Sequence, residues 1–205
     1  MKLSNIDFSK LKFSLLKKLL RDQMAAGVVE FTDLKSTVPS KGNLDSFGYV
    51  EDSFYIDHPI KKVFNHYKYA NPNEAWKGGN WIAFGLAVDK NSGAIYYPGD
   101  DYPGGKVGQV LYLHSTIFGL KKLCMAQEII TIDEENYLIE FSYIEKGMTT
   151  GIQIMQFSKV NENQTKITHI SRFKGVSRFR DTYLYPYFHS KIVRKFHGNL
   201  KRSLG

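Results

Sequence analysis

The chain has a single cysteine, Cys124, among its 205 residues. One cysteine excludes an intramolecular disulfide, which fits a reducing compartment. A lone cysteine is also far more often a small buried hydrophobe than a nucleophile. None of the six histidines is spaced as His-x-x-x-His, and Cys124 has no second cysteine with which to build a zinc site. The sequence therefore predicts no metal centre and no bound cofactor.

Long apolar runs are missing as well. No window is long and apolar enough to cross a bilayer. Lys10, Lys12, Lys17 and Lys18 interrupt the N-terminal stretch that a signal peptide would keep apolar. We therefore expect a cytoplasmic protein.

Two catalytic signatures are also absent. The chain has no Gly-x-Ser-x-Gly elbow, which excludes an α/β-hydrolase. Residues 97–108 are rich in glycine but lack Gly-Lys-Ser/Thr and do not lead into a helix, which argues against a phosphate loop. We expect a loop there, either mobile at a cavity mouth or a simple surface turn.

Acidic residues are outnumbered, since 28 Lys and Arg face 20 Asp and Glu for a formal net charge of +8. A basic chain attracts nucleic acid, anionic lipid or acidic partners. The charge is dispersed, with clusters in residues 10–21 and 191–202 that suit the solvated faces of two helices. A nucleic-acid reader would interleave basic residues with exposed aromatics on one platform. Most aromatics here fall at apolar, inward positions, so we expect no nucleic-acid partner.

What the chain does have is alternation of apolar and polar residues. Residues 137–143 and 165–174 each follow period two, which is the signature of a strand with one buried face. The inward positions are Tyr137, Ile139, Phe141 and Tyr143 in the first run, and Ile167, His169, Ser171 and Phe173 in the second. Lys166, Arg172 and Lys174 mark the wet face of the second run, so His169 and Ser171 are predicted to point inward.

Two further runs, residues 126–132 and 150–158, are strand-like but carry apolar residues at both odd and even positions. The pattern therefore does not show which face of either strand is buried. Turn residues separate the four runs at 133–136, 146–147 and 161–163. Such short connections favour antiparallel pairing, because a parallel crossover needs a dozen or more residues.

An amphipathic helix is predicted to close the chain over residues 182–203. Its apolar stripe at helical spacing is Tyr185, His189, Ile192, Phe196 and Leu200. Pro186 is tolerated only in a first turn, so the regular helix should begin near Tyr185. A helix of this kind must bury its stripe against the sheet.

A first amphipathic helix is predicted over residues 7–24, followed by a linker at 33–46 that contains Pro39 and Gly42. This organisation predicts an N-terminal helix and linker at 1–46 and a compact domain at 47–205. The helix is expected to be separable, and it could dock on its own domain, on a partner or on an anionic membrane surface.

The compact domain is predicted to open with a strand at 47–56 and a helix started by Pro59, with Asp57 or His58 as its cap. A second, short helix is expected after Pro72 and includes Trp76.

The order of these elements resembles the START-like superfamily, also called SRPBCC or Bet v 1-like. Residues 53–64, Ser-Phe-Tyr-Ile-Asp-His-Pro-Ile-Lys-Lys-Val-Phe, look like its opening, and 166–169 followed by a helix ending in 199–201 look like its close. The resemblance implies an α+β helix-grip fold, in which a curved antiparallel sheet wraps around a long C-terminal helix with a cavity between them. Members bind lipids, sterols, polyketides or plant hormones, and some are enzymes. No catalytic motif carries over to this chain, so its catalytic residues stay unassigned.

Ten residues are candidates for the wall of such a cavity: His169, Ser171, Tyr143, Phe141, Tyr112, Trp81, Trp76, Tyr185, His189 and Ile192. His169 stands out because a neutral imidazole on an apolar strand face could hydrogen-bond a ligand or act as a general base. The alternative is a core histidine satisfied by its neighbours. His189 lies on the helix stripe, so the two histidines could meet across the cavity.

Three functions compete. The first is the binding of a small apolar molecule, and it leads because a cavity is predicted and a catalytic constellation is not. The second is a cyclase or dehydratase that uses His169 or a nearby acid, with water excluded, in the same cavity. The third is an interaction module whose basic helices contact a partner or, through residues 1–26, a membrane. The sequence assigns neither the ligand nor the oligomeric state.

Overall fold

The computed structural model describes residues 1–38, 44–78, 81–117 and 121–205. Its strands pair antiparallel in one eight-stranded sheet of order β1-β8-β7-β6-β5-β4-β2-β3. The strands are β1 (Gly48–Ile56), β2 (Ile82–Asp89), β3 (Ile95–Tyr96), β4 (Gln109–Ile117), β5 (Lys121–Asp133), β6 (Leu138–Tyr143), β7 (Thr149–Asn161) and β8 (Gln164–Gly175). The α-helices are α1 (Ser14–Ala25), α2 (Ile60–Lys68), α3 (Pro72–Ala75) and α4 (Tyr185–Leu204).

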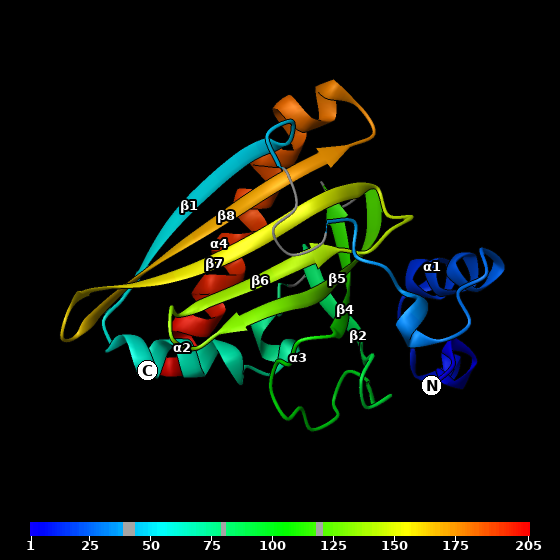
Figure 1. The fold of residues 1–205 in the computed structure, drawn as a ribbon, viewed down its shortest axis with the longest axis horizontal. Coiled ribbons are helices and arrows are strands. Elements are labelled where there is room, and N and C mark those ends of the chain that lie inside the picture. Colours follow the sequence, from blue (N-terminus) through cyan, green and yellow to red (C-terminus); the bar gives the residue numbers. More distant parts are fainter. Residues whose placement is uncertain (39–43, 79–80, 118–120) are drawn as a thin grey trace.

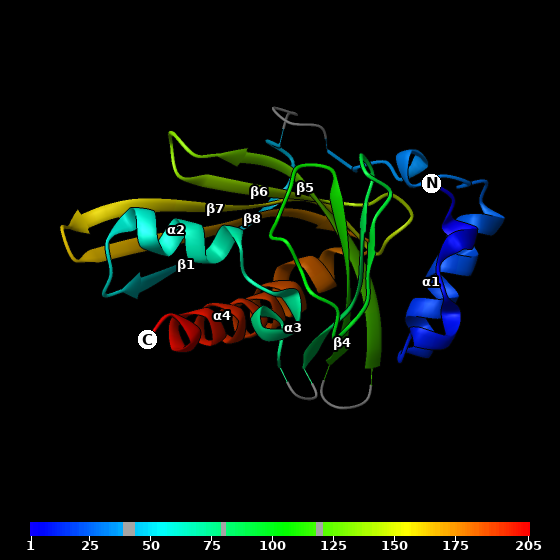
Figure 2. The same ribbon diagram turned by 90° about the horizontal axis from the view of Figure 1, so that it is seen from below.

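The sheet curves around α4, which lies in its concave side together with α2 and α3 (Figures 1 and 2). This arrangement confirms the predicted helix-grip fold. A π-helical turn, Arg180–Leu184, joins β8 to α4, and α4 begins at the predicted Tyr185. Among the helices of the described ranges, none is both long and apolar enough to span a bilayer.

One hydrophobic cluster fills the space between the concave face and α4. Phe196 and Leu200 of α4 meet Val63 and Phe64 of α2 in this cluster. Burial on β8 alternates as predicted, with Ile167, His169, Ser171 and Phe173 buried and the residues between them partly exposed. The period-two pattern of the sequence therefore records a strand that is covered on one face only.

A second cluster covers the opposite face of the sheet at β2 and β4. Leu16 and Leu20 of α1 pack there against Leu86, Val88 and Tyr112, and Figure 2 shows α1 on the far side of β4 from α4. Strand β2 is consequently buried on both faces along most of its length. The N-terminal segment thus completes the core of these central strands.

The N-terminal helix begins later than predicted. Residues 7–24 are not one helix, because a 3-10 turn at Phe8–Lys10 precedes α1 and the backbone of Phe13 is extended. The Asp7 carboxylate accepts hydrogen bonds from the backbone N–H and the hydroxyl of Ser9. Such local side-chain bonds offer the backbone an alternative to the helix.

The predicted linker at 33–46 is partly docked on the sheet. Thr37 N–H donates to the carbonyl of Tyr143, and Glu145 N–H donates to the carbonyl of Lys35. Residues 34–38 therefore run along the end of β6, whereas Pro39 and Gly42 lie outside the described residues.

Two local predictions are wrong, and one of the two alternatives for residues 97–108 is excluded. Pro59 is itself the N-cap of α2, and neither Asp57 nor His58 caps that helix. Trp76 follows the short helix α3 rather than belonging to it. Residues 97–108 form a loop, but it packs against α2 through the Gly105 N–H to Lys68 carbonyl bond and contributes nothing to the wall of the cavity described below.

Two glycines should respond oppositely to alanine. A Cβ on Gly198, inside α4, would meet only the far end of Arg202 at 3.6 Å, so Gly198→Ala should stabilise the fold by about 0.5–1 kcal/mol. At Gly151 φ is +128° and a Cβ would lie 1.9 Å from the Arg172 carbonyl oxygen. Gly151→Ala should therefore destabilise by more than about 1 kcal/mol. Urea unfolding measures both, and destabilisation by Gly198→Ala would contradict this account of α4.

Candidate functional site

A cavity of about 390 Å³ lies between the sheet and the first turns of α4. Its position follows from unequal strand lengths. Strand β6 pairs with β5 only from Gln127 onward, and the Ile144 N–H to Ala126 carbonyl bond ends that contact. Leu123 and Met125 of β5 line the cavity beyond this point. The cavity therefore forms where β5 continues and β6 does not.

Five of the ten predicted wall residues line the cavity. They are Trp76, Tyr143, Tyr185, His189 and Ile192. Three of these belong to the apolar stripe of α4, so the structure brings the closing helix and the strand face of β6 together around one space.

The other five lie elsewhere. His169 and Ser171 are buried behind the wall, where their polar atoms are bonded to other side chains. Phe141 packs against the inner hydrophobic cluster. Tyr112 belongs to the outer cluster under α1, because Leu111 and Leu113 hold the inward positions of β4. Trp81 lies outside the cavity under the ammonium of Lys191, which is 5.3 Å from its ring centroid.

His189 is the polar group that the cavity leaves without a partner. Its side chain is 7% exposed, and neither ring nitrogen has a hydrogen-bond partner among the described residues. Its ring stacks on Tyr185 with centroids 5.3 Å apart and meets the ring of His169 edge-on at 5.5 Å. Burial lowers the pKa of His189 to about 4, so at neutral pH the imidazole offers one donor and one acceptor.

Both ring nitrogens of His169, in contrast, have hydrogen-bond partners. Its Nε2–H donates to Oε1 of Gln153 at 3.1 Å, which leaves Nδ1 as an acceptor. The Nε2–H of His197 therefore donates to that Nδ1 at 2.8 Å, and the hydroxyl of Tyr67 donates to Nδ1 of His197 at 2.8 Å. Each imidazole is neutral in this arrangement, which agrees with the pKa of both being lowered by burial.

The same hydrogen bonds continue from Gln153 into the cavity wall. Its amide Nε2–H donates to the Tyr143 hydroxyl at 2.8 Å. The Tyr143 and Tyr185 hydroxyls are 2.7 Å apart, and the Tyr185 hydroxyl is 2.9 Å from Oγ of Ser171. We name this series the polar chain: Tyr67, His197, His169, Gln153, Tyr143, Tyr185 and Ser171. Burial raises the pKa of Tyr143 and of Tyr185, so its phenols are also neutral.

Sequence analysis missed several wall residues. Gln153 lies on β7, whose faces the pattern left unassigned, and Phe188 falls one position off the selected stripe. Arg180 also lines the cavity, but its guanidinium pairs with the Asp181 carboxylate at 2.8 Å. The described residues contain no group of three or more His, Cys, Asp or Glu side chains placed to hold a metal ion.

Three buried histidines should make the fold sensitive to acid. Burial lowers the pKa of His189 to about 4, that of His197 to about 3 and that of His169 well below its ordinary value. The unfolded chain binds these protons near pH ~6.5, so their stabilisation is complete above that pH and is lost as the pH falls toward ~4. Each histidine can contribute at most about 1.4 kcal/mol per pH unit over that window.

The urea concentration at the midpoint of unfolding should fall as the pH is lowered through this window. His189→Phe should flatten the slope, while His58→Gln, at a histidine that is only half-buried, should retain it. A midpoint that stays constant down to pH ~4.5 would contradict the buried, neutral state of these rings.

Cys124 should report the same burial. It lines the cavity, and burial raises the pKa of its thiol to about 12. Because the thiolate is the reactive form, alkylation by iodoacetamide near neutral pH should be about a thousandfold slower than for a free thiol. Addition of urea should restore the free-thiol rate. Mass spectrometry follows both, and rapid labelling of the folded chain would contradict the raised pKa of this half-buried thiol.

The fold is similar to solved structures at low sequence identity. Major latex-like protein 151 from Panax ginseng superposes with a TM-score of 0.55 and 14% identity, over 76% of this chain and 96% of that chain. TTHA0849 from Thermus thermophilus gives 0.56 and 15%, over 76% and 96%. Norcoclaurine synthase from Thalictrum flavum, in complex with dopamine and hydroxybenzaldehyde, gives 0.56 and 10%, over 76% and 85%.

No family model and no curated protein matches the sequence. At these identities the likeness concerns the fold alone. It confirms the predicted helix-grip fold, which the chain shares with these Bet v 1-like structures.

Proposed function

We propose that this chain binds a small, mostly apolar molecule that carries one hydrogen-bonding group. The observation that supports the proposal is His189 in the wall of a largely apolar cavity, because both of its buried ring nitrogens lack a hydrogen-bond partner among the described residues. A buried polar group left unbonded costs about 1–3 kcal/mol. A ligand hydroxyl or carbonyl at this point would recover that cost.

The size and the lining of the cavity support the same class of ligand. A volume of about 390 Å³ lies within the range of small-molecule sites, roughly 300–1,000 Å³. Leu123, Met125, Phe188 and Ile192 supply apolar wall, and few polar groups interrupt it. Lipids, sterols and polyketides with a single polar end have this character.

The charges favour a neutral ligand. The guanidinium of Arg180 is already compensated by Asp181, and His189 is neutral at physiological pH because its pKa is lowered to about 4. Neither group offers the unpaired cation that a carboxylate would need. The expected location for this function is the cytoplasm.

Catalysis in the same cavity is the second candidate. The observation that favours it is again His189, since a neutral imidazole with a free nitrogen can accept a proton from a bound substrate. A cyclase or dehydratase would place its reacting C–H or O–H within hydrogen-bond distance of that nitrogen. Binding ranks first because it requires only the cavity and this one polar contact.

A matched pair of fluorescent probes tests the proposal. Wild type should bind both 1-hydroxypyrene and 1-methylpyrene, and it should prefer the hydroxylated probe by about tenfold, the equivalent of one hydrogen bond. His189→Phe keeps the ring volume but removes both nitrogens, so it should bind the two probes equally.

His114→Phe is the matched control, because His114 stacks on Phe13 of the N-terminal segment at 4.3 Å and does not line the cavity. It should retain the wild-type preference. If neither probe binds wild type, the proposed binding of a small apolar molecule is wrong. If His189→Phe keeps the preference, His189 is not the anchor.

A further inference from the structure

Exposed apolar side chains gather at one place, between the end of β8 and the second turn of α4. Within residues 176–187, which we name the tip, Val176 is 72% exposed and Phe179 and Tyr183 are each 65% exposed. Leu184 and Tyr187 are exposed as well. Exposed large apolar residues elsewhere in the described part of the chain are scattered, as on most proteins. A contiguous apolar cluster of this kind marks an interaction surface.

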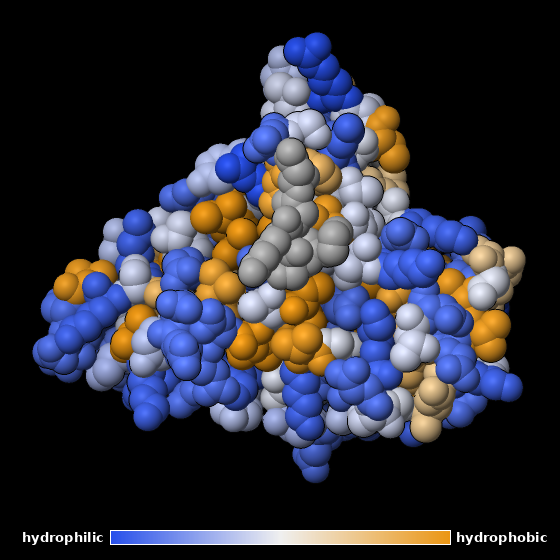
Figure 3. Space-filling model, viewed as in Figure 1, coloured by the Kyte–Doolittle hydropathy of each residue, from blue (hydrophilic) through white to orange (hydrophobic). Residues whose placement is uncertain are grey.

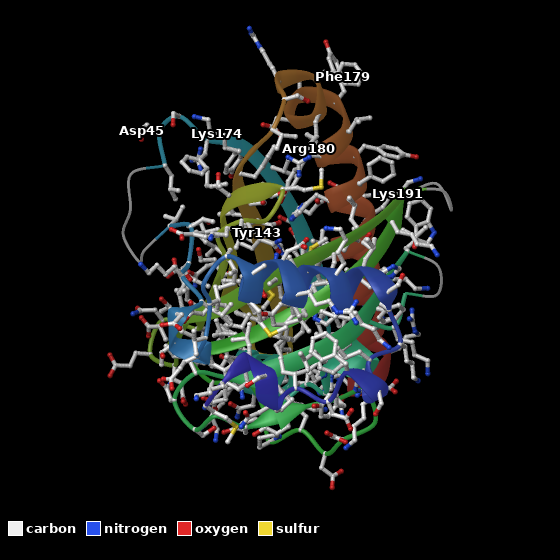
Figure 4. All side chains as sticks on the ribbon, turned by 90° about the vertical axis from the view of Figure 1, so that its right-hand side faces the viewer. Asp45, Tyr143, Lys174, Phe179, Arg180 and Lys191 are labelled. Carbon is white, nitrogen blue, oxygen red and sulfur yellow. The ribbon has the colours of Figure 1, made fainter. Side chains whose placement is uncertain are left out.

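The tip is built to present these side chains outward. Its inward side is held by Asp181, whose carboxylate accepts from the Gly175 N–H at 2.7 Å, and by Arg180, which bonds to Thr149. Phe179, Tyr183 and Tyr187 then recur every four residues on the other side. Figure 1 shows this segment projecting beyond the sheet, and Figure 4 places Phe179 at its outer end.

Basic residues surround the exposed rings. Lys174, Arg178 and Lys191 are exposed, and the Lys191 ammonium lies 4.3 Å from the centroid of the Tyr187 ring. Asp181 is the one acidic residue in the sequence from 174 to 191, and its carboxylate is bonded to Arg180. Figure 3 shows hydrophilic and hydrophobic residues side by side on this projection. The surface is therefore both apolar and positively charged.

We propose that the tip docks on an anionic lipid surface. Aromatic side chains with a polar end favour the membrane interface, and Lys and Arg beside them attract anionic headgroups. The shape agrees with this occupant, because a narrow convex projection can enter a headgroup layer but offers little area for a stable protein interface. The membrane contact expected from residues 1–26 would need a different surface, since Leu16 and Leu20 of α1 are buried against the sheet.

The tip also adjoins the cavity. Arg180 and Leu184 belong to the tip and line the cavity, as does the exposed Met148 in the neighbouring β6–β7 turn. Docking through the tip would therefore bring this side of the cavity toward the lipid. An apolar ligand could then enter or leave without crossing water, a consequence that rests on the proposed function, whereas the docking itself does not.

Flotation with vesicles tests the docking on the full chain. Wild type should float with vesicles of phosphatidylcholine mixed with phosphatidylglycerol, and it should float much less with phosphatidylcholine alone. Phe179→Ser combined with Tyr183→Ser should lower partitioning to the anionic vesicles by about tenfold or more. Lys174→Glu combined with Arg178→Glu should remove the dependence on phosphatidylglycerol.

Two control variants make the result specific. Tyr55→Ser combined with Tyr69→Ser removes two comparably exposed rings outside the tip and should float like wild type. Lys12→Glu combined with Lys17→Glu alters the N-terminal basic cluster and should also float like wild type.

Several outcomes would overturn the proposal. They are no flotation of wild type on anionic vesicles, flotation that survives the loss of Phe179 and Tyr183, and flotation lost only in the Lys12 and Lys17 variant. Gel filtration tests the alternative that the tip binds a second copy of this chain. The tip would be a self-association surface if wild type were a dimer that did not float and the tip variant were a monomer. Flotation through the tip together with failure of both pyrene probes would retain the docking and reject the proposed function.

Discussion

The position and orientation of α4 on the curved sheet depend on the polar chain. This run of hydrogen bonds links α2, α4, β8, β7 and β6 and returns to α4 at Tyr185. Its imidazoles and phenols are neutral, so it avoids the larger cost of burying charge. Loss of one link would leave a buried group without a partner, which costs about 1–3 kcal/mol. Because the polar chain holds α4 at both His197 and Tyr185, it fixes how the helix is rotated about its axis on the sheet.

That rotation decides which histidine faces the cavity. His189 lies between the two anchoring residues of α4 and lines the cavity, and the described residues offer its ring nitrogens no hydrogen bond. His169 is equally buried but uses both nitrogens within the polar chain. An unbonded buried group in an otherwise satisfied network needs its own explanation, and the proposed ligand would supply one.

The sequence predicts this fold best where a strand is covered on one face only. Strands β6 and β8 alternate cleanly, and α4 carries its stripe at helical spacing, so their faces and the helix-grip order follow from periodicity. No strand was predicted over 82–89 or 109–117, the ranges of β2 and β4, where α1 covers the face opposite α4 and both faces of the strands are apolar. For the same reason the sequence does not reveal that Tyr112 faces α1.

The cavity was harder to predict than the fold. Its place depends on where β6 stops pairing with β5, which is a property of register and not of composition. Its unpaired polar group depends on which of two inward histidines finds partners, and those partners, Gln153 and His197, come from elements far apart in the sequence. Periodicity places a side chain on a face, but only tertiary contacts show whether its polar atoms are already used.

The gap beside β5 also ties the N-terminal segment to the site. Beyond the end of β6, the cavity wall extends past β5 to Leu19 and Gln23 of α1. Gln23 is itself fixed there by a hydrogen bond from the Tyr112 hydroxyl at 3.0 Å. Helix α1 therefore closes one side of the cavity while it covers the outer cluster. A chain that lacks α1 would consequently lose part of its cavity wall together with the cover of β2 and β4. The prediction that residues 1–46 are independent of the domain at 47–205 therefore cannot be tested separately from the integrity of the cavity.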